Sequence, residues 1–186
     1  MNASWHISSR RAFRILYLLL TTSLVWGCED IDNFDVSVDG ETTVPAASPL
    51  ELILGDIPLT EAFTHFDITQ AQGFKNDKYT VDDVDSVRLK SLVMTATVPE
   101  GADLSFLGEV IFYAETAGLP QKEIARQDTF PVGQRAVSFA VVRDDLKSYL
   151  LAPEGGITVE VLDSSRPKFE TTLSIKAVFD VDVNVL

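Results

Sequence analysis

Apolar and polar side chains alternate along much of the chain after residue 33, and this two-residue period is typical of β-strands. The alternation is clearest from residue 169 to residue 185, where one parity is apolar or Thr and the other is mostly polar. We therefore predict a long strand with one face in the core and the other in water. The predicted core face carries Phe169, Thr171, Leu173, Ile175, Ala177, Phe179, Val181, Val183 and Val185.

The stretch from 86 to 98 has the same period but changes phase in its middle. Val87 and Leu89 share one parity, whereas Leu92 and Met94 share the other. A regular strand cannot turn both sets to one core, so we predict a β-bulge or a sharp bend between Leu89 and Leu92. The alternative is a strand whose C-terminal half is buried on both faces.

Further strands and two short helices complete the predicted elements. Apolar residues on both faces make 109–115 a central strand, and mixed charges make 121–128 an edge strand. Thr80 and Asp83 have the spacing of a capping box, which predicts a short helix through Val84. A second short helix is predicted over 144–151, with Leu146, Tyr149 and Leu150 on one side. The remaining predicted strands cover 34–39, 135–142 and 157–163.

Together these elements predict an all-β fold, a single antiparallel β-sandwich that is immunoglobulin-like or similar. Seven to nine short strands separated by turns, with one or two short connecting helices, are typical of this class.

The first 27 residues have the pattern of an export signal. A basic stretch ending at Arg14 precedes 12 mainly apolar residues, from Ile15 to Trp26. Such a run is too short to cross a hydrocarbon layer of roughly 30 Å as a helix, but it suits a signal core. The alternative is a buried helix at the start of the domain. On the first interpretation, the chain consists of a signal peptide over 1–27, an acidic tether over 28–33 and a sandwich domain over 34–186.

The end of the apolar run, Leu24-Val25-Trp26-Gly27-Cys28, resembles the lipobox of bacterial lipoproteins. Val25 and Gly27 match the aliphatic and small positions, whereas Trp26 stands where a small residue is usual. The resemblance implies that Cys28 is acylated and becomes the new N-terminus. The alternative is an ordinary signal that leaves Cys28 as a free thiol.

Two features beside the apolar run leave the export route and the final location open. Ser9-Arg10-Arg11-Ala12-Phe13 resembles the twin-arginine export motif, although it also reads as a plain basic flank. The acids that follow Cys28 resemble the tethers of some surface-displayed lipoproteins of Gram-negative bacteria, or form a solvated spacer. We expect a cell-envelope protein in the outer membrane of a Gram-negative bacterium, on either its periplasmic or its surface side.

Charge restricts the partners of the mature chain. The formal net charge of −13 includes three arginines and no acid in residues 1–27, so residues 28–186 carry −13 − 3 = −16. Such a chain repels phosphate backbones, and we expect no nucleic-acid partner. No polybasic segment is present to hold anionic lipids, so membrane attachment is expected through the lipid on Cys28.

Catalytic patterns are missing from the sequence. His65 is the only histidine after Cys28, and no nucleophile elbow occurs. We expect His65 to pack at the edge of the core rather than to act as a catalytic base. The chain is accordingly expected to be no enzyme and to use no cofactor.

Carboxylates provide the candidate metal ligands, because hard cations such as calcium prefer several convergent oxygens. One group is Asp82, Asp83 and Asp85, and another is Asp180 and Asp182 along one strand face. Neither group has the spacing of an EF-hand loop, and the alternative for both is a solvated face.

An aromatic pair offers a different candidate site. Phe74 and Tyr79 form either a small platform for a sugar or a cover over one end of the core.

We therefore expect a membrane-anchored envelope lipoprotein that acts as a non-catalytic binding or structural module for a protein partner. The alternatives are a ligand-binding module for calcium, glycan or lipid, and a hydrolase that uses paired carboxylates. A sandwich fold by itself selects none of them.

Overall fold

The computed structural model of the chain describes residues 33–46, 61–64, 68, 74, 79–165 and 167–184, with only the backbone of residues 61 and 62. The chain divides into two compact units, Met1–Ile31 and Asp32–Leu186, and all described residues belong to the second. The predicted signal peptide, Val25, Gly27, Cys28 and His65 lie outside the described residues.

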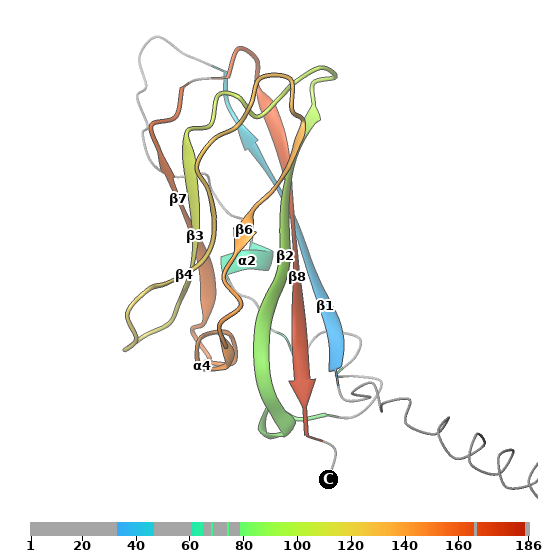
Figure 1. Cartoon of the computed structure of the whole chain (residues 1–186), viewed down its shortest axis with the longest axis vertical. Helices are drawn as coiled ribbons and strands as arrows, with labels where there is room; N and C mark the ends of the chain where they lie inside the picture. Colours follow the sequence, from blue (N-terminus) through green and yellow to red (C-terminus); the bar gives the residue numbers. More distant parts are fainter. Residues whose placement is uncertain are drawn as a thin grey trace, which may run out of the picture. The chain divides into compact units, whose positions relative to one another are not determined.

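The domain consists of two antiparallel sheets that lie face to face, as Figure 1 shows. Sheet A has the strand order β1 (Asn33–Val44), β8 (Thr171–Val183), β2 (Val84–Val98) and β5 (Ala136–Ser138). Sheet B has the order β6 (Ala140–Val141), β4 (Lys122–Gln127), β3 (Glu109–Glu115) and β7 (Gly156–Leu162). The predicted β-sandwich is therefore confirmed.

Strand β8 lies between β1 and β2, and its alternating pattern is the reason for its central place. The predicted core parity is buried along the whole strand, with Leu173, Ala177 and Phe179 fully enclosed. The prediction was wrong at Phe169, which is 57% exposed because β8 begins only at Thr171. Val185 lies outside the described residues.

Strand β2 contains the predicted bulge. Its register against β8 shifts between Leu89 and Ser91, so that Lys90 is an extra residue without a partner. Leu89, Leu92 and Met94 consequently all face the same core and are at most 1% exposed. Two further shifts, between Val84 and Ser86 and between Ala96 and Val98, were not predicted.

Residues 136–141 form two strands in different sheets instead of the one predicted strand over 135–142. Ala136–Ser138 pairs with β2 in sheet A, and Ala140–Val141 pairs with β4 in sheet B. Between them, the Phe139 amide donates to the Leu92 carbonyl at 2.9 Å, and its ring meets Phe112 edge-on at 5.2 Å. The crossing chain closes one side of the sandwich.

Strand β4 is not the edge strand that its charges predicted, because β6 covers part of its outer side at Ala125 and Arg126. β3 lies between β4 and β7, which confirms the predicted central strand.

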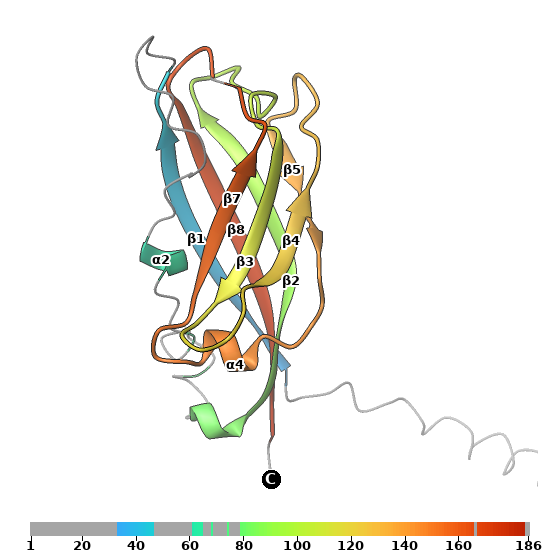
Figure 2. The ribbon, with the colours of Figure 1, turned by 90° about the vertical axis from the view of Figure 1, so that its left-hand side faces the viewer.

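Short helices complete the core. α2 (Glu61–Thr64) lies against β1 and β7 on the other side of the sandwich, beside β1 in Figure 2, and buries Phe63 completely. A Cβ on Gly156 would lie 2.6 Å from the Thr64 carbonyl oxygen, so this close approach requires glycine. The predicted second helix is shorter than expected, α4 (Lys147–Leu150), and it buries Tyr149 and Leu150.

Candidate functional site

The two ends of the sandwich differ, and the register of β1 with β8 defines them. Asn33 pairs with Asp182 at one end, which also holds α4 and the 3-10 turn η2 (Val81–Asp83), and we call it the proximal end. Val44 pairs with Thr171 at the other end, which we call the distal end. The distal end also carries the loops over 99–108, 128–135 and 163–170 (Figure 2).

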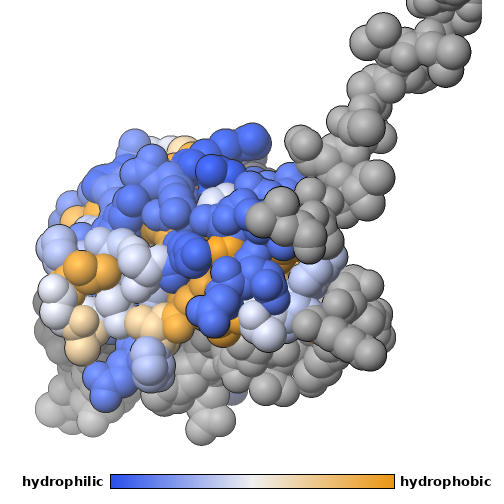
Figure 3. All heavy atoms as spheres, turned by 90° about the horizontal axis from the view of Figure 1, so that it is seen from below, coloured by the Kyte–Doolittle hydropathy of each residue, from blue (hydrophilic) through white to orange (hydrophobic). Residues whose placement is uncertain are grey.

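Exposed apolar side chains concentrate at the distal end. Val132, Phe169 and Val98 are 86%, 57% and 55% exposed, and they are the three most exposed large hydrophobic side chains among the described residues. The other exposed ones lie between 36% and 42%. Seen from below, the described surface of the proximal end is mostly hydrophilic, with small apolar groups between (Figure 3). The three most exposed apolar side chains of the described residues thus lie at the distal end.

The Asp103 carboxylate joins two of the distal loops. It accepts hydrogen bonds from the Ser105 hydroxyl at 2.7 Å and the Ser105 amide at 3.1 Å, within its own loop. It also accepts one from the Gly133 amide at 2.6 Å, in the loop that carries Val132. These bonds, that of the Ser105 hydroxyl foremost, lower the pKa of Asp103 below its ordinary value. The carboxylate therefore stays ionised and holds the two loops together.

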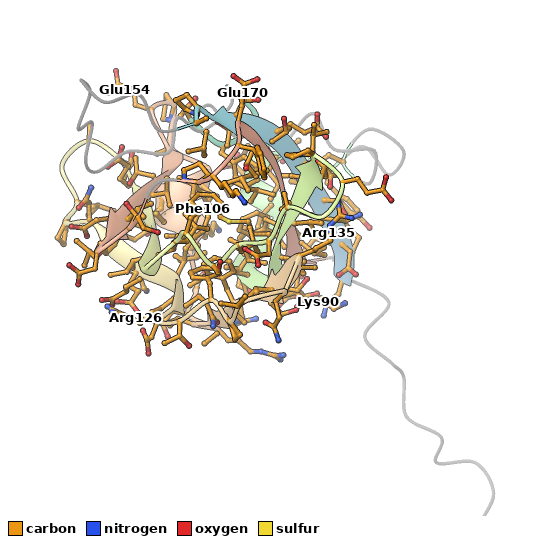
Figure 4. The ribbon with its side chains drawn as sticks, turned by 90° about the horizontal axis from the view of Figure 1, so that it is seen from above. Lys90, Phe106, Arg126, Arg135, Glu154 and Glu170 are labelled. Carbon is orange, nitrogen blue, oxygen red and sulfur yellow. The ribbon has the colours of Figure 1, made fainter. Side chains whose placement is uncertain are left out.

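Hydrogen bonds to backbone carbonyls connect the third loop and the end of β2 to the same assembly. The Phe106 carbonyl accepts from the Ser165 amide at 2.7 Å and the Ser165 hydroxyl at 3.1 Å. The Arg135 guanidinium donates to the Ala96 and Thr97 carbonyls at 3.1 and 3.3 Å. From above, Phe106 lies near the centre of this end, with Arg135 and Glu170 toward its rim (Figure 4). The distal apolar groups are therefore presented by loops that hydrogen bonds hold in place.

The aromatic residues predicted as a platform or a cover lie at the start of β1. Phe74 is 3% exposed and meets the Phe34 ring edge-on at 5.5 Å. Tyr79 stacks on the Phe34 ring, at 6.0 Å between ring centroids. Phe74 thus belongs to the core, and Phe34 and Tyr79 are partly buried against it, as in the predicted cover over one end of the core.

The candidate metal ligands are distributed over separate contacts. The Thr80 amide and hydroxyl both donate to the Asp83 carboxylate at 2.7 Å, which completes the predicted capping box and lowers the pKa of Asp83. Asp180 stands opposite Asp35 and Arg88 in neighbouring strands, and Asp182 stands opposite Asn33 and Ser86. Asp82 is exposed in η2, and Asp85 is exposed at a register shift of β2. Within the described part of the chain, no three His, Cys, Asp or Glu side chains are grouped to hold a metal ion.

The outer face of sheet B holds a charged cluster that the sequence patterns did not indicate as a unit. Arg126 binds Glu123 at 2.8 Å and also pairs with Glu109 on β3. The Tyr113 hydroxyl donates to Glu160 on β7 at 3.0 Å, and desolvation followed by this bond raises the pKa of Tyr113. The mixed charges of 121–128 were the only signal for it, because the partners come from three strands. Arg126 and the Tyr113 hydroxyl thus contact carboxylates of the same cluster.

Comparison with known proteins gives no family for the chain: no protein-family model matches it, and no curated protein matches it. A search of the described residues for a helix long and apolar enough to cross a membrane finds none.

Proposed function

We propose that the chain is a lipid-anchored envelope protein whose β-sandwich binds a protein partner through its distal end and catalyses no reaction. The observation that carries this proposal is that, among the residues that the structure describes, the three most exposed apolar side chains lie at the end opposite Asn33. Apolar groups that remain in water on ordered loops are typical of protein interaction sites.

The chain connectivity supports this arrangement. Asn33 follows the lipobox residue Cys28 by 33 − 28 = 5 residues, which span at most about 18 Å when fully extended. A lipid on Cys28 would therefore keep the proximal end close to the membrane. β8 has 13 residues and extends about 44 Å at 3.4 Å per residue, so the length of the sandwich separates the distal end from Asn33.

Metabolic labelling with an alkyne fatty acid tests the anchor. The wild type should become labelled and stay with the membrane until detergent is added, whereas Cys28→Ala should be unlabelled and soluble. Trp26→Ala is the matched control, since it changes the neighbouring position toward the lipobox pattern and should keep the label. Equal labelling of wild type and Cys28→Ala would refute the anchor.

A further inference from the structure

The outward-facing side chains in the middle of sheet A are mostly small and uncharged. β8 and β2 are its two inner strands, and their outward positions over 172–178 and 91–95 include one charged residue, Lys176. Small hydroxyl-bearing and β-branched side chains lose little rotamer freedom when another surface covers them. This part of the sheet is therefore suited to flat packing against another sheet face. The uncharged residues are Thr172, Ser174, Val178, Ser91, Val93 and Thr95, all partly exposed.

Charge is distributed unevenly across the width of the same face. β1, at one edge, carries three exposed acids and no base, whereas residues 86–98 of β2 and the whole of β5, toward the other edge, carry two exposed bases and no acid. The acids are Asp35, Asp39 and Glu41, and the bases are Arg88 and Lys90. Lys90 is bound to Asp35 of its own chain at 2.8 Å. A face with one acidic and one basic side is complementary to itself when a second copy is turned so that unlike sides meet.

The face is also large enough for a specific interface. Its three long strands, β1, β8 and β2, lie side by side (Figure 1). At about 4.8 Å per strand they cover about 14 Å in width, and β8 extends about 44 Å. Two copies would thus bury on the order of 1,200 Å² in total, which is at the lower end of the range for specific protein interfaces.

We propose that two copies of the chain associate through the outer faces of sheet A, with their strands in the same direction and β1 of each copy opposite β5 of the other. The strand order then places β8 of each copy opposite β2 of the other. The acidic side of one copy meets the side of the other that has no acid, and the uncharged middle positions meet one another. Since the strands run in the same direction, both proximal ends lie on the same side, as two copies held in one membrane by the proposed anchor require. This association goes beyond the function proposed for the distal end.

Charge disfavours the other two-fold arrangements of the same faces. An axis across the strands would place every strand opposite its own copy, so the three acids of β1 would face three acids. An axis along β8 would place Lys176 opposite the same lysine of the second copy. The arrangement with β1 opposite β5 avoids both contacts.

One row of residues across sheet A provides the test. Glu41 on β1 pairs with Ser174, which pairs with Thr95, which pairs with Ala136 on β5. Glu41 and Ala136 are both exposed, and three strand spacings, about 14 Å, separate them within one chain. In the proposed pair of copies they lie opposite one another. A substitution at one position can therefore be compensated at the other only between copies.

Two full-length copies with different epitope tags, expressed in the same cells and extracted with detergent, report the association by co-purification. The wild-type copies should co-purify. Ala136→Glu in both copies should lower the yield about fivefold or more, because it places an acid opposite Glu41 of the second copy, and adding Glu41→Lys to both should restore most of it. Ala140→Glu is the matched control, an exposed alanine on β6 of sheet B, and should leave the yield unchanged.

Each other result would overturn the proposal. Wild-type copies that do not co-purify would exclude the self-interface. A yield that Ala136→Glu leaves unchanged would show that the copies meet through another surface or share only a micelle. A yield that Glu41→Lys does not restore would exclude the pairing of β1 with β5. The melting temperature of purified Ala136→Glu should stay close to that of wild type, because residue 136 is exposed, and a distant substitution would not restore the yield of an unfolded domain.

Discussion

Lys90 reaches across β8 to Asp35 on β1, where its amine lies 2.9 and 2.8 Å from the two carboxylate oxygens. Asp35 raises the pKa of Lys90 above its ordinary value by this bond and by its charge. Both side chains remain about half exposed, so the pair itself contributes little to stability. The importance of Lys90 lies in its backbone, which is the extra residue of the bulge.

Deletion of Lys90 should therefore be far more damaging than Lys90→Ala. Without the extra residue, either Leu89 or the pair Leu92 and Met94 must leave the core face, at a cost of roughly 4 kcal/mol or more in unfolding free energy. Chemical denaturation of the two variants measures this difference. A deletion variant as stable as Lys90→Ala would contradict the role of the bulge.

Phe179→Ala should lower the unfolding free energy by about 3–5 kcal/mol, because the ring is fully buried opposite Leu89 and its loss leaves a cavity. Asp180→Asn and Asp182→Asn are the controls on the outer face of the same strand, and they should change it by less than about 0.5 kcal/mol. Urea denaturation compares the three. An Asn variant that loses as much as Phe179→Ala would contradict the assignment of the faces.

Calcium should leave the melting temperature of the wild type unchanged, since Asp180 and Asp182 stand in separate cross-strand contacts. The double variant Asp180→Asn, Asp182→Asn serves as the reference. Thermal denaturation with and without calcium measures the effect, and a rise confined to the wild type would show that these carboxylates bind the ion.

Asp103→Asn should loosen the distal loops, because the Asn side chain brings an NH2 donor to a position where the Asp103 carboxylate accepts three hydrogen bonds. Hydrogen exchange at the Gly133 amide should become faster, while exchange in β8 should not.

The same carboxylate predicts a pH dependence. Folding lowers the pKa of Asp103. The ionised carboxylate therefore stabilises the fold above its unfolded pKa of about 3.9, and this stabilisation is lost as the pH falls through the lower pKa of the folded state. Wild-type protection at Gly133 should therefore decline below about pH 4, and unchanged exchange in Asp103→Asn would contradict the model of joined loops.

The sequence was most informative where one strand carries the whole pattern. The parity of β8 and the phase change of β2 are local properties, and both predicted features are present. The crossing at Phe139 was not foreseen, because alternation continues through the residue at which the chain changes sheets.

Long-range contacts account for the other differences. Phe63, Ile68 and Phe74 belong to the core although they come from the part of the chain with the least regular sequence pattern. The distal site was also missed, since the exposure of Val132, Phe169 and Val98 depends on how loops far apart in sequence meet. For Phe169 the local pattern indicated the opposite of what the fold does.

The antiparallel register of β1 and β8 also determines how the domain carries mechanical load. β1 begins at Asn33 on the proximal end, and β8 begins at Thr171 on the distal end, with continuous pairing from Asn33↔Asp182 to Val44↔Thr171. A pull between residue 33 and residue 171 is directed along both strands, so it strains all the hydrogen bonds of this ladder at once in shear. A pull between Asn33 and the C-terminal end of β8 would instead open them one after another. The register thus lets the β1–β8 ladder resist a load applied between its N-terminal end and the distal loops better than a load that separates the two strands from one end.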